Sequence, residues 1–66
     1  MKSPKFILRS DQELQLFTLR KEGENWEEQF DSIHRAMLFA RLLPDSKGLS
    51  FVIYSSRGME LAHMTV

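Results

Sequence analysis

The stretch Asp31-Ser-Ile-His-Arg-Ala-Met-Leu-Phe-Ala-Arg-Leu-Leu-Pro44 decides the fold, because it holds the strongest helix signal in the chain. Asp31 and Ser32 are both favourable N-cap residues, since their side-chain oxygens accept hydrogen bonds from the free backbone N–H groups of the first turn. Nothing between Ile33 and Leu43 interrupts a helix, and Pro44 ends it by pushing the preceding residue out of the α region. The pattern therefore predicts one helix over residues 33–43.

Apolar residues lie on two sides of this helix. At about 100° per residue, one broad stripe is predicted to pack on a sheet, and it consists of Ile33, Ala36, Met37, Phe39, Ala40 and Leu43. His34, Leu38 and Leu42 form a second ridge on the far side, flanked by Arg35 and Arg41. Burying two leucines is worth about 3–6 kcal/mol, which is comparable with the net stability of a small domain. We therefore predict that a partner covers this ridge, with simple exposure to water as the alternative.

Short apolar runs separated by polar turns predict strands on both sides of the helix. Before the helix, residues 5–9 and 13–21 are expected strands, and residues 26–30 are either a third short strand or an extended arm. After it, strands are expected at residues 49–54 and 59–66, joined by a hairpin turn from Ser55 to Gly58. The order β-β-(β)-α-β-β indicates an α+β domain with a small antiparallel sheet of four or five strands and one helix on one face.

The strands also place apolar residues on both faces of the sheet. In the strand 49–54, Leu49, Phe51 and Ile53 point one way, and Val52 and Tyr54 point the other. One short helix covers only one face. We therefore include Val52 and Tyr54 in the predicted interface, with sheet stacking and edge-to-edge strand pairing as alternative arrangements of two copies.

The 66 residues are expected to form one domain with residues 1–4 as a flexible tail. A chain this short buries only about 60% of its unfolded surface, and it has no cysteine for a disulfide or a Cys-based zinc site. Oligomerisation is the remaining way to add stability. Nine basic and nine acidic residues give a net charge of zero, which disfavours nucleic-acid binding through bulk charge. With no apolar run long enough to span a membrane and no visible signal peptide, a cytoplasmic location is expected.

No motif in the chain predicts catalysis, a cofactor or a metal site. His34 and His63 lack the paired spacing of metal ligands, so we interpret both as surface or interface residues. The acidic residues between positions 22 and 31 lack the order of an EF-hand loop and are interpreted as a solvated charge run. Trp26 lies among them and is expected to pack on the core rather than to anchor a partner.

Four segments carry a resemblance to a known family, and they are Arg20-Lys21-Glu22-Gly23, Phe30-Asp31-Ser32, residues 36–41, and Phe51-Val52-Ile53-Tyr54 leading to Arg57-Gly58. Over about Arg20 to Leu61 the chain resembles the bacterial family of domains of unknown function number 2188. The resemblance implies the β-β-(β)-α-β-β order and no particular activity. The first half also resembles small antitoxin domains that begin with three strands and a helix.

Taken together, the residues predict a small non-catalytic protein that acts as an oligomerising protein-interaction module, as a homodimer or with another protein. The predicted interface consists of His34, Arg35, Leu38, Arg41, Leu42, Val52 and Tyr54. The alternative is a small nucleic-acid-associated regulator or an antitoxin-like protein, in which a β-ribbon of a symmetric dimer reads DNA. That alternative requires a cluster in space of Arg9, Arg20, Lys21, Arg35, Arg41 and Arg57.

Overall fold

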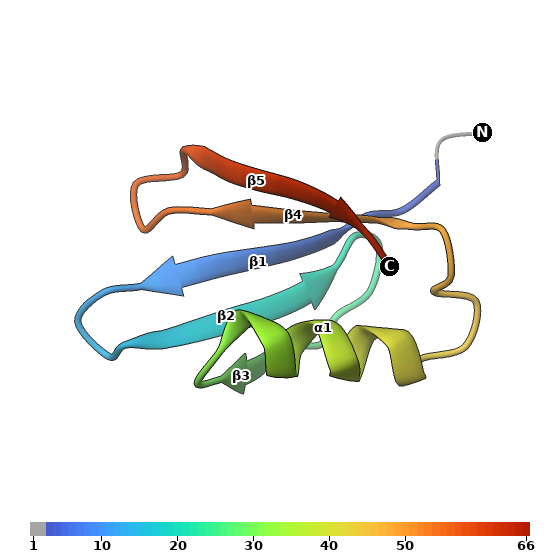
Figure 1. Cartoon of the computed structure of the whole chain (residues 1–66), viewed down its shortest axis with the longest axis horizontal. Helices are drawn as coiled ribbons and strands as arrows, with labels where there is room; N and C mark the ends of the chain where they lie inside the picture. Colours follow the sequence, from blue (N-terminus) through green and yellow to red (C-terminus); the bar gives the residue numbers. More distant parts are fainter. Residues whose placement is uncertain (1–2) are drawn as a thin grey trace.

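A computed structural model describes residues 3–66 as one sheet with one helix packed on one of its faces (Figure 1). The elements in chain order are β1 (Phe6–Asp11), β2 (Leu16–Lys21), β3 (Glu28–Phe30), α1 (Ile33–Leu42), β4 (Ser50–Tyr54) and β5 (Glu60–Thr65). This is the predicted α+β order, and the segment left open between strand and arm contains a strand of three residues. The predicted tail lies partly outside the described residues, which begin at Ser3.

The sheet is mixed rather than antiparallel throughout. Its strand order in space is β3-β2-β1-β4-β5, in which β1 and β4 run parallel and the other three neighbouring pairs run antiparallel. The number of chain reversals explains this geometry. The chain reverses from β1 to β2 and again from β2 to β3, and α1 then carries it back so that β4 starts from the same end of the sheet as β1 (Figure 1). β1 is therefore the central strand, with a hydrogen-bonded neighbour on each side.

The turn between β1 and β2 lies later in the chain than the sequence predicts. Asp11 ends β1, and its Oδ1 accepts hydrogen bonds from the backbone N–H groups of Glu13 and Leu14 at 3.1 and 3.2 Å. Gln15 adopts a positive φ of 53°, and β2 begins only at Leu16. Leu14 is thus an exposed turn residue, because the local hydrogen bonds of Asp11 outweigh the strand tendency of the residues that follow it.

The helix begins and ends as its sequence indicates. Ser32 has an extended backbone, and its Oγ accepts the N–H of Arg35 at 3.1 Å, which satisfies one free donor of the first turn. At the other end, the N–H of Leu43 bonds to the carbonyl of Ala40 at 3.2 Å, and Pro44 prevents a further turn. Both ends of α1 are therefore set by local chemistry.

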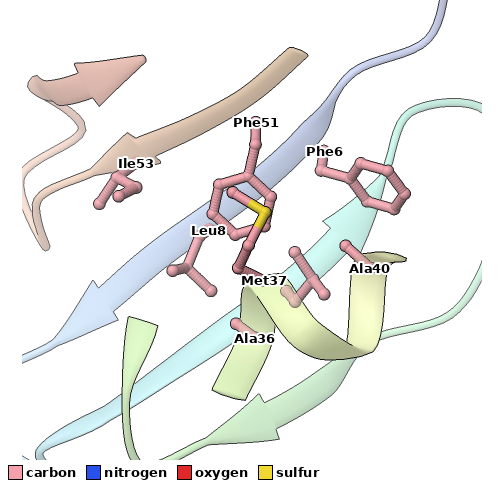
Figure 2. Packing of buried hydrophobic residues seen from close by; sticks show 8 residues of the cluster. Phe6, Leu8, Ala36, Met37, Ala40, Phe51 and Ile53 are labelled. Carbon is pink, nitrogen blue, oxygen red and sulfur yellow. The ribbon is translucent and has the colours of Figure 1, made fainter. Parts of the chain in front are cut away.

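The core lies between α1 and the sheet (Figure 2). Phe6 and Leu8 from β1, Leu19 from β2 and Phe51 from β4 are fully buried. On the helix, Ala36, Met37 and Ala40 are buried, and the remaining residues of the predicted stripe pack against the same cluster, namely Ile33, Phe39 and Leu43. The stripe is therefore confirmed, and its two alanines let the helix backbone lie close to the strands.

Aromatic side chains close the core at the β3 edge. The ring of Phe39 lies 5.9 Å from that of Trp26, edge-on, and 5.3 Å from that of Phe30, between centroids. Aromatic pairs in this range add a modest favourable term to the burial of their surface. The prediction that Trp26 packs on the core is confirmed.

The helix covers only part of the sheet. It packs on β1, β2 and β3, and Figure 1 shows β5 beyond β4 with no helix over it. All six residues of β5 are exposed, and this strand is hydrogen-bonded on one side only, to β4. We refer to the free side of Glu60–Thr65 as the β5 edge.

The hairpin before β5 matches the predicted turn. Ser55 Oγ accepts hydrogen bonds from the N–H groups of Arg57 and Met59. Gly58 has a backbone φ of 83°, which residues other than glycine rarely adopt. Next to the turn, Tyr54 of β4 pairs with Glu60 of β5. The preceding residue of β4, Ile53, pairs with Ala62, so Leu61 has no partner of its own on β4. Leu61 is thus the extra residue of a β-bulge at the start of β5.

Burial predicts which leucines hold the domain together. Leu8→Ala removes a fully buried side chain of β1 from the core between α1 and the sheet, so we expect it to lower the free energy of unfolding by about 2–5 kcal/mol. Leu14→Ala is the matched control, because the same change is made at an exposed turn residue, and we expect a change within about 0.5 kcal/mol. Urea unfolding followed by far-UV circular dichroism at equal protein concentrations measures both. Similar losses in the two variants would contradict this core.

The N-cap supports a second stability prediction. Ser32→Ala leaves the Arg35 N–H without its side-chain acceptor, so we expect the free energy of unfolding to fall by about 1 kcal/mol. Ser3→Ala, at an exposed position before β1, serves as the control and should leave the urea midpoint unchanged. An equal midpoint for Ser32→Ala and the unchanged protein would show that Asp31 or water replaces the cap.

Candidate interaction surfaces

The predicted ridge on α1 is uncovered in the single chain. Leu38 is 43% exposed and Leu42 is 84% exposed, and His34, Arg35 and Arg41 are exposed beside them. The only contact described for these polar groups is an ion pair in which Arg35 Nε lies 3.5 Å from Asp31 Oδ1. Both side chains of that pair are largely exposed, so it adds little stability. The structure thus brings the five helical residues of the predicted interface together on the outer side of α1.

The face of the sheet opposite α1 covers itself to a large extent. We call it the open face, and its residues are paired across neighbouring strands as Ile7 with Arg20, Ile7 with Val52, and Val52 with His63. Val52 is only 2% exposed. Val52 is therefore already buried within the single chain and needs no partner to cover it.

A bridge between distant residues explains the burial of Val52. Lys5 Nζ donates a hydrogen bond to Tyr54 Oη at 3.2 Å. In the β1–β4 pair, Phe6 lies beside Phe51, so Lys5 lies before Val52 along the strand direction. Tyr54 lies two residues after Val52 and on the same face, so the side chains of Lys5 and Tyr54 meet above Val52. The hydrogen bond to Tyr54 is also the main reason that the pKa of Lys5 is raised, with further contributions from Glu22 and Glu60. Tyr54 is half-buried, and its hydroxyl is already occupied within the chain.

A hollow of about 650 Å³ lies on the open face beside the β1–β2 turn. Arg9 and Arg20 line it, and the Arg9 guanidinium donates to the carbonyl of Ser56 at 3.2 Å. Three carboxylates, from Asp11, Glu13 and Glu27, line the same hollow. The charges of its lining are therefore mixed, which does not favour a polyanion such as nucleic acid.

Arg57 is exposed in the hairpin turn and directly follows Ser56, which lines the same hollow, whereas the other three predicted basic residues lie elsewhere on the molecule. Arg35 and Arg41 belong to the outer side of α1, and Lys21 faces the helix side of the sheet, where its Nζ lies 5.6 Å from the centre of the Phe6 ring. The structure thus separates onto two sides of the sheet the basic residues that a nucleic-acid-binding protein would need together.

The β5 edge is a surface that the sequence did not single out. Leu61 is 62% exposed and Met64 36% exposed, and Met59 in the preceding turn is also exposed. A hollow of about 310 Å³ lies at the far end of this strand, lined by Arg41, Ser46, Lys47 and Val66. The alternation of apolar residues in 59–66 indicates a strand, but it does not indicate that the strand lies at an edge.

The acidic loop before β3 has a structural role. Glu24 Oε1 accepts the indole N–H of Trp26 at 2.8 Å, and its other oxygen lies 3.2 Å from Lys21 Nζ. These contacts lower the pKa of Glu24 below its usual value, with the Trp26 hydrogen bond as the larger cause and Lys21 as the second. In residues 3–66 no three His, Asp or Glu side chains gather as ligands for a metal ion. No helix in the same residues has the length and apolar character that a bilayer crossing requires.

The lowered pKa of Glu24 leads to a pH-dependent signal. The hydrogen bond from Trp26 to the Glu24 carboxylate is at full strength above the ordinary pKa of 4.5, and it weakens as the pH falls through the lower folded-state value, because a protonated carboxyl group is a poorer acceptor. Since Trp26 is the single tryptophan, its fluorescence emission should change with a midpoint below pH 4.5. Far-UV circular dichroism at each pH separates this step from acid unfolding.

Glu24→Gln is the matched variant for this titration, because its carboxamide oxygen still accepts the indole N–H but does not titrate. The emission step should be absent in this variant. A step that persists in Glu24→Gln, or a midpoint at or above 4.5 in the unchanged protein, would contradict the assignment.

Comparisons with protein-family models, with curated proteins and with solved structures give no match to this chain. The resemblance of the segment from Arg20 to Leu61 to the family number 2188 therefore stays a prediction.

Proposed function

We propose that this protein is a non-catalytic interaction module that works as a homodimer. The supporting observation is the distribution of apolar side chains in the single chain. The open face buries its own Val52 under Lys5 and Tyr54, whereas large apolar side chains of α1 and β5 stay exposed, namely Leu38, Leu42, Leu61 and Met64. Apart from Leu14 in the β1–β2 turn, the large exposed apolar side chains of residues 3–66 thus lie on the helix ridge and at or next to the β5 edge.

The size of the chain makes such an association feasible. The single chain exposes 4936 Å². A small but specific interface removes about 1,200 Å² in total, or about 600 Å² from each copy. That amounts to roughly one eighth of the surface of the single chain. The zero net charge leaves little long-range repulsion between copies.

The nucleic-acid alternative has weaker support. Five of its six predicted basic residues are divided, with Arg9 and Arg20 on the open face and Lys21, Arg35 and Arg41 on the helix side, and three carboxylates accompany Arg9 and Arg20 in the hollow. A protein that binds a phosphate backbone without sequence specificity needs a continuous basic surface. We therefore retain the interaction module as the proposed function.

Solution mass tests this proposal directly. Light scattering coupled to size exclusion should give twice the mass of one chain at high concentration and a fall toward one chain on dilution. A monomer at every concentration up to about 1 mM would limit the free energy of self-association to less than about 4 kcal/mol, and the homodimer would then be abandoned. Far-UV circular dichroism of the same samples confirms that each is folded.

A further inference from the structure

We propose that the second copy pairs antiparallel with the β5 edge, so that the two sheets join into one continuous sheet across a two-fold axis. This inference rests on the proposed homodimer and names the surface that forms it. The β5 edge is the only long strand edge in residues 3–66, since β5 has six residues and the opposite edge strand, β3, has three. An exposed strand of this length is a ready template for another strand.

The backbone of β5 presents free hydrogen-bonding groups at regular intervals. Val66 directs its N–H and its carbonyl toward the β4 side, where they bond to the Leu49 carbonyl and the Gly48 N–H, each at 2.9 Å. Antiparallel pairs alternate between residues that bond inward and residues that bond outward. His63 and Thr65 therefore direct their N–H and carbonyl groups away from β4, toward the open edge. In the single chain these groups are exposed to water, and a second extended backbone can pair with the whole row at once.

Symmetry and this alternation restrict the register of two β5 strands. In a two-fold antiparallel pair, outward-bonding residues must face outward-bonding residues. We place His63 opposite His63 of the second copy, because this register pairs five of the six residues of β5 and keeps its centre clear of the bulge at Leu61. Ala62 then lies opposite Met64, and Leu61 opposite Thr65. On the helix side of the sheet, the small side chain of Ala62 then faces the large side chain of Met64, which allows close packing. Met64, now partly exposed, would gain cover from the second copy.

The charges along β5 agree with pairing between identical copies. Glu60 is the single Asp, Glu, Lys or Arg of this strand, and it lies at the first position. Antiparallel pairing sends each Glu60 to the far end of the other strand, so the two carboxylates stay apart. That far end carries Arg41 and Lys47 around the hollow beside Val66. Opposite charges are therefore brought to the same end of the interface.

The helix ridge is less suited to self-association. Leu38 and Leu42 form a narrow apolar strip with Arg35 and Arg41 on its flanks and His34 beside it. Two copies packed ridge to ridge would bring these cations together, and Asp31 is already paired with Arg35. The β3 edge, in turn, is short and carries Glu28 next to Glu27. Such an edge discourages pairing, so β5-to-β5 association closes as a dimer instead of extending into a filament.

Single cysteines test the register, since the chain has none of its own. In the proposed pair the two Cα atoms of residue 63 lie about 5.5 Å apart, which is within the range that a disulfide bridges. His63→Cys should therefore form a covalent dimer under mild oxidation, at a concentration where the unchanged protein is dimeric. Leu42→Cys, on the ridge of α1, is the matched control and should remain a free thiol. Cross-linking through Leu42→Cys and not through His63→Cys would overturn the inference.

A proline variant tests the backbone groups themselves. The N–H of His63 points away from β4, so His63→Pro removes a donor of the open edge and leaves the β4–β5 ladder in place. We expect the dissociation constant of the dimer to rise by about tenfold or more, because two symmetry-related hydrogen bonds are lost. His63→Ala keeps the N–H and should change the constant by less than about threefold. Urea unfolding of the dilute, monomeric proteins verifies that both variants fold alike.

The outcomes separate this inference from the proposed function. If the unchanged protein is monomeric at all concentrations, the homodimer itself is wrong. If the protein is dimeric but His63→Pro leaves the dissociation constant unchanged, the homodimer stands and the β5 edge is wrong. In that case Leu38→Glu combined with Leu42→Glu should abolish the dimer, because the helix ridge is then the seam.

Discussion

The structure depends on one constraint of size, which is that a single helix is too narrow for a five-stranded sheet. An α-helix is about 10 Å across with its side chains, and neighbouring strands are about 4.8 Å apart. Ten helical residues therefore cover the strands that they cross and leave the rest bare. α1 lies over β1, β2 and β3, the buried side chains concentrate beneath it, and β4 contributes its Phe51 and Ile53 from the side. β5 lies beyond the reach of the helix, which is why all of its residues are exposed.

The two faces of the sheet meet this constraint in different ways. One face is covered by a separate element. The other is covered by the long side chains of its own strands, since Lys5 and Tyr54 join above Val52. The aliphatic part of a lysine shields apolar surface while its ammonium group stays in contact with water. A small domain can thus keep a second face closed without a second layer, and the burial that it still lacks lies at the strand edge and on the outer side of the helix.

Much of the fold could be predicted from local patterns. The helix from Ile33, its cap at Ser32, the apolar stripe around Ala36 and Ala40, and the turn at Gly58 all follow from residues close together in the chain, and the structure confirms them. The position of β4 beside β1 could not be predicted, because apolar periodicity identifies strands but not their neighbours. The burial of Val52 was missed for a related reason, since it depends on a side chain 47 positions earlier, at Lys5. The β5 edge could not be predicted either, because the order of the strands in the sheet decides which strand lies at its edge.

The parallel pairing of β1 with β4 has a consequence for how the chain folds. The β1–β2 and β4–β5 hairpins close short loops, whereas Phe6 must find Phe51, 45 positions later, before the central pair can form. Loop-closure entropy rises with the length of chain enclosed, and topologies rich in such distant pairings fold more slowly. Docking of the second hairpin onto β1 is thus the expected rate-limiting event. Until it occurs, β1 and β4 each have a free side in addition to the two outer edges of the sheet, and neighbouring chains can pair with these free sides by strand exchange.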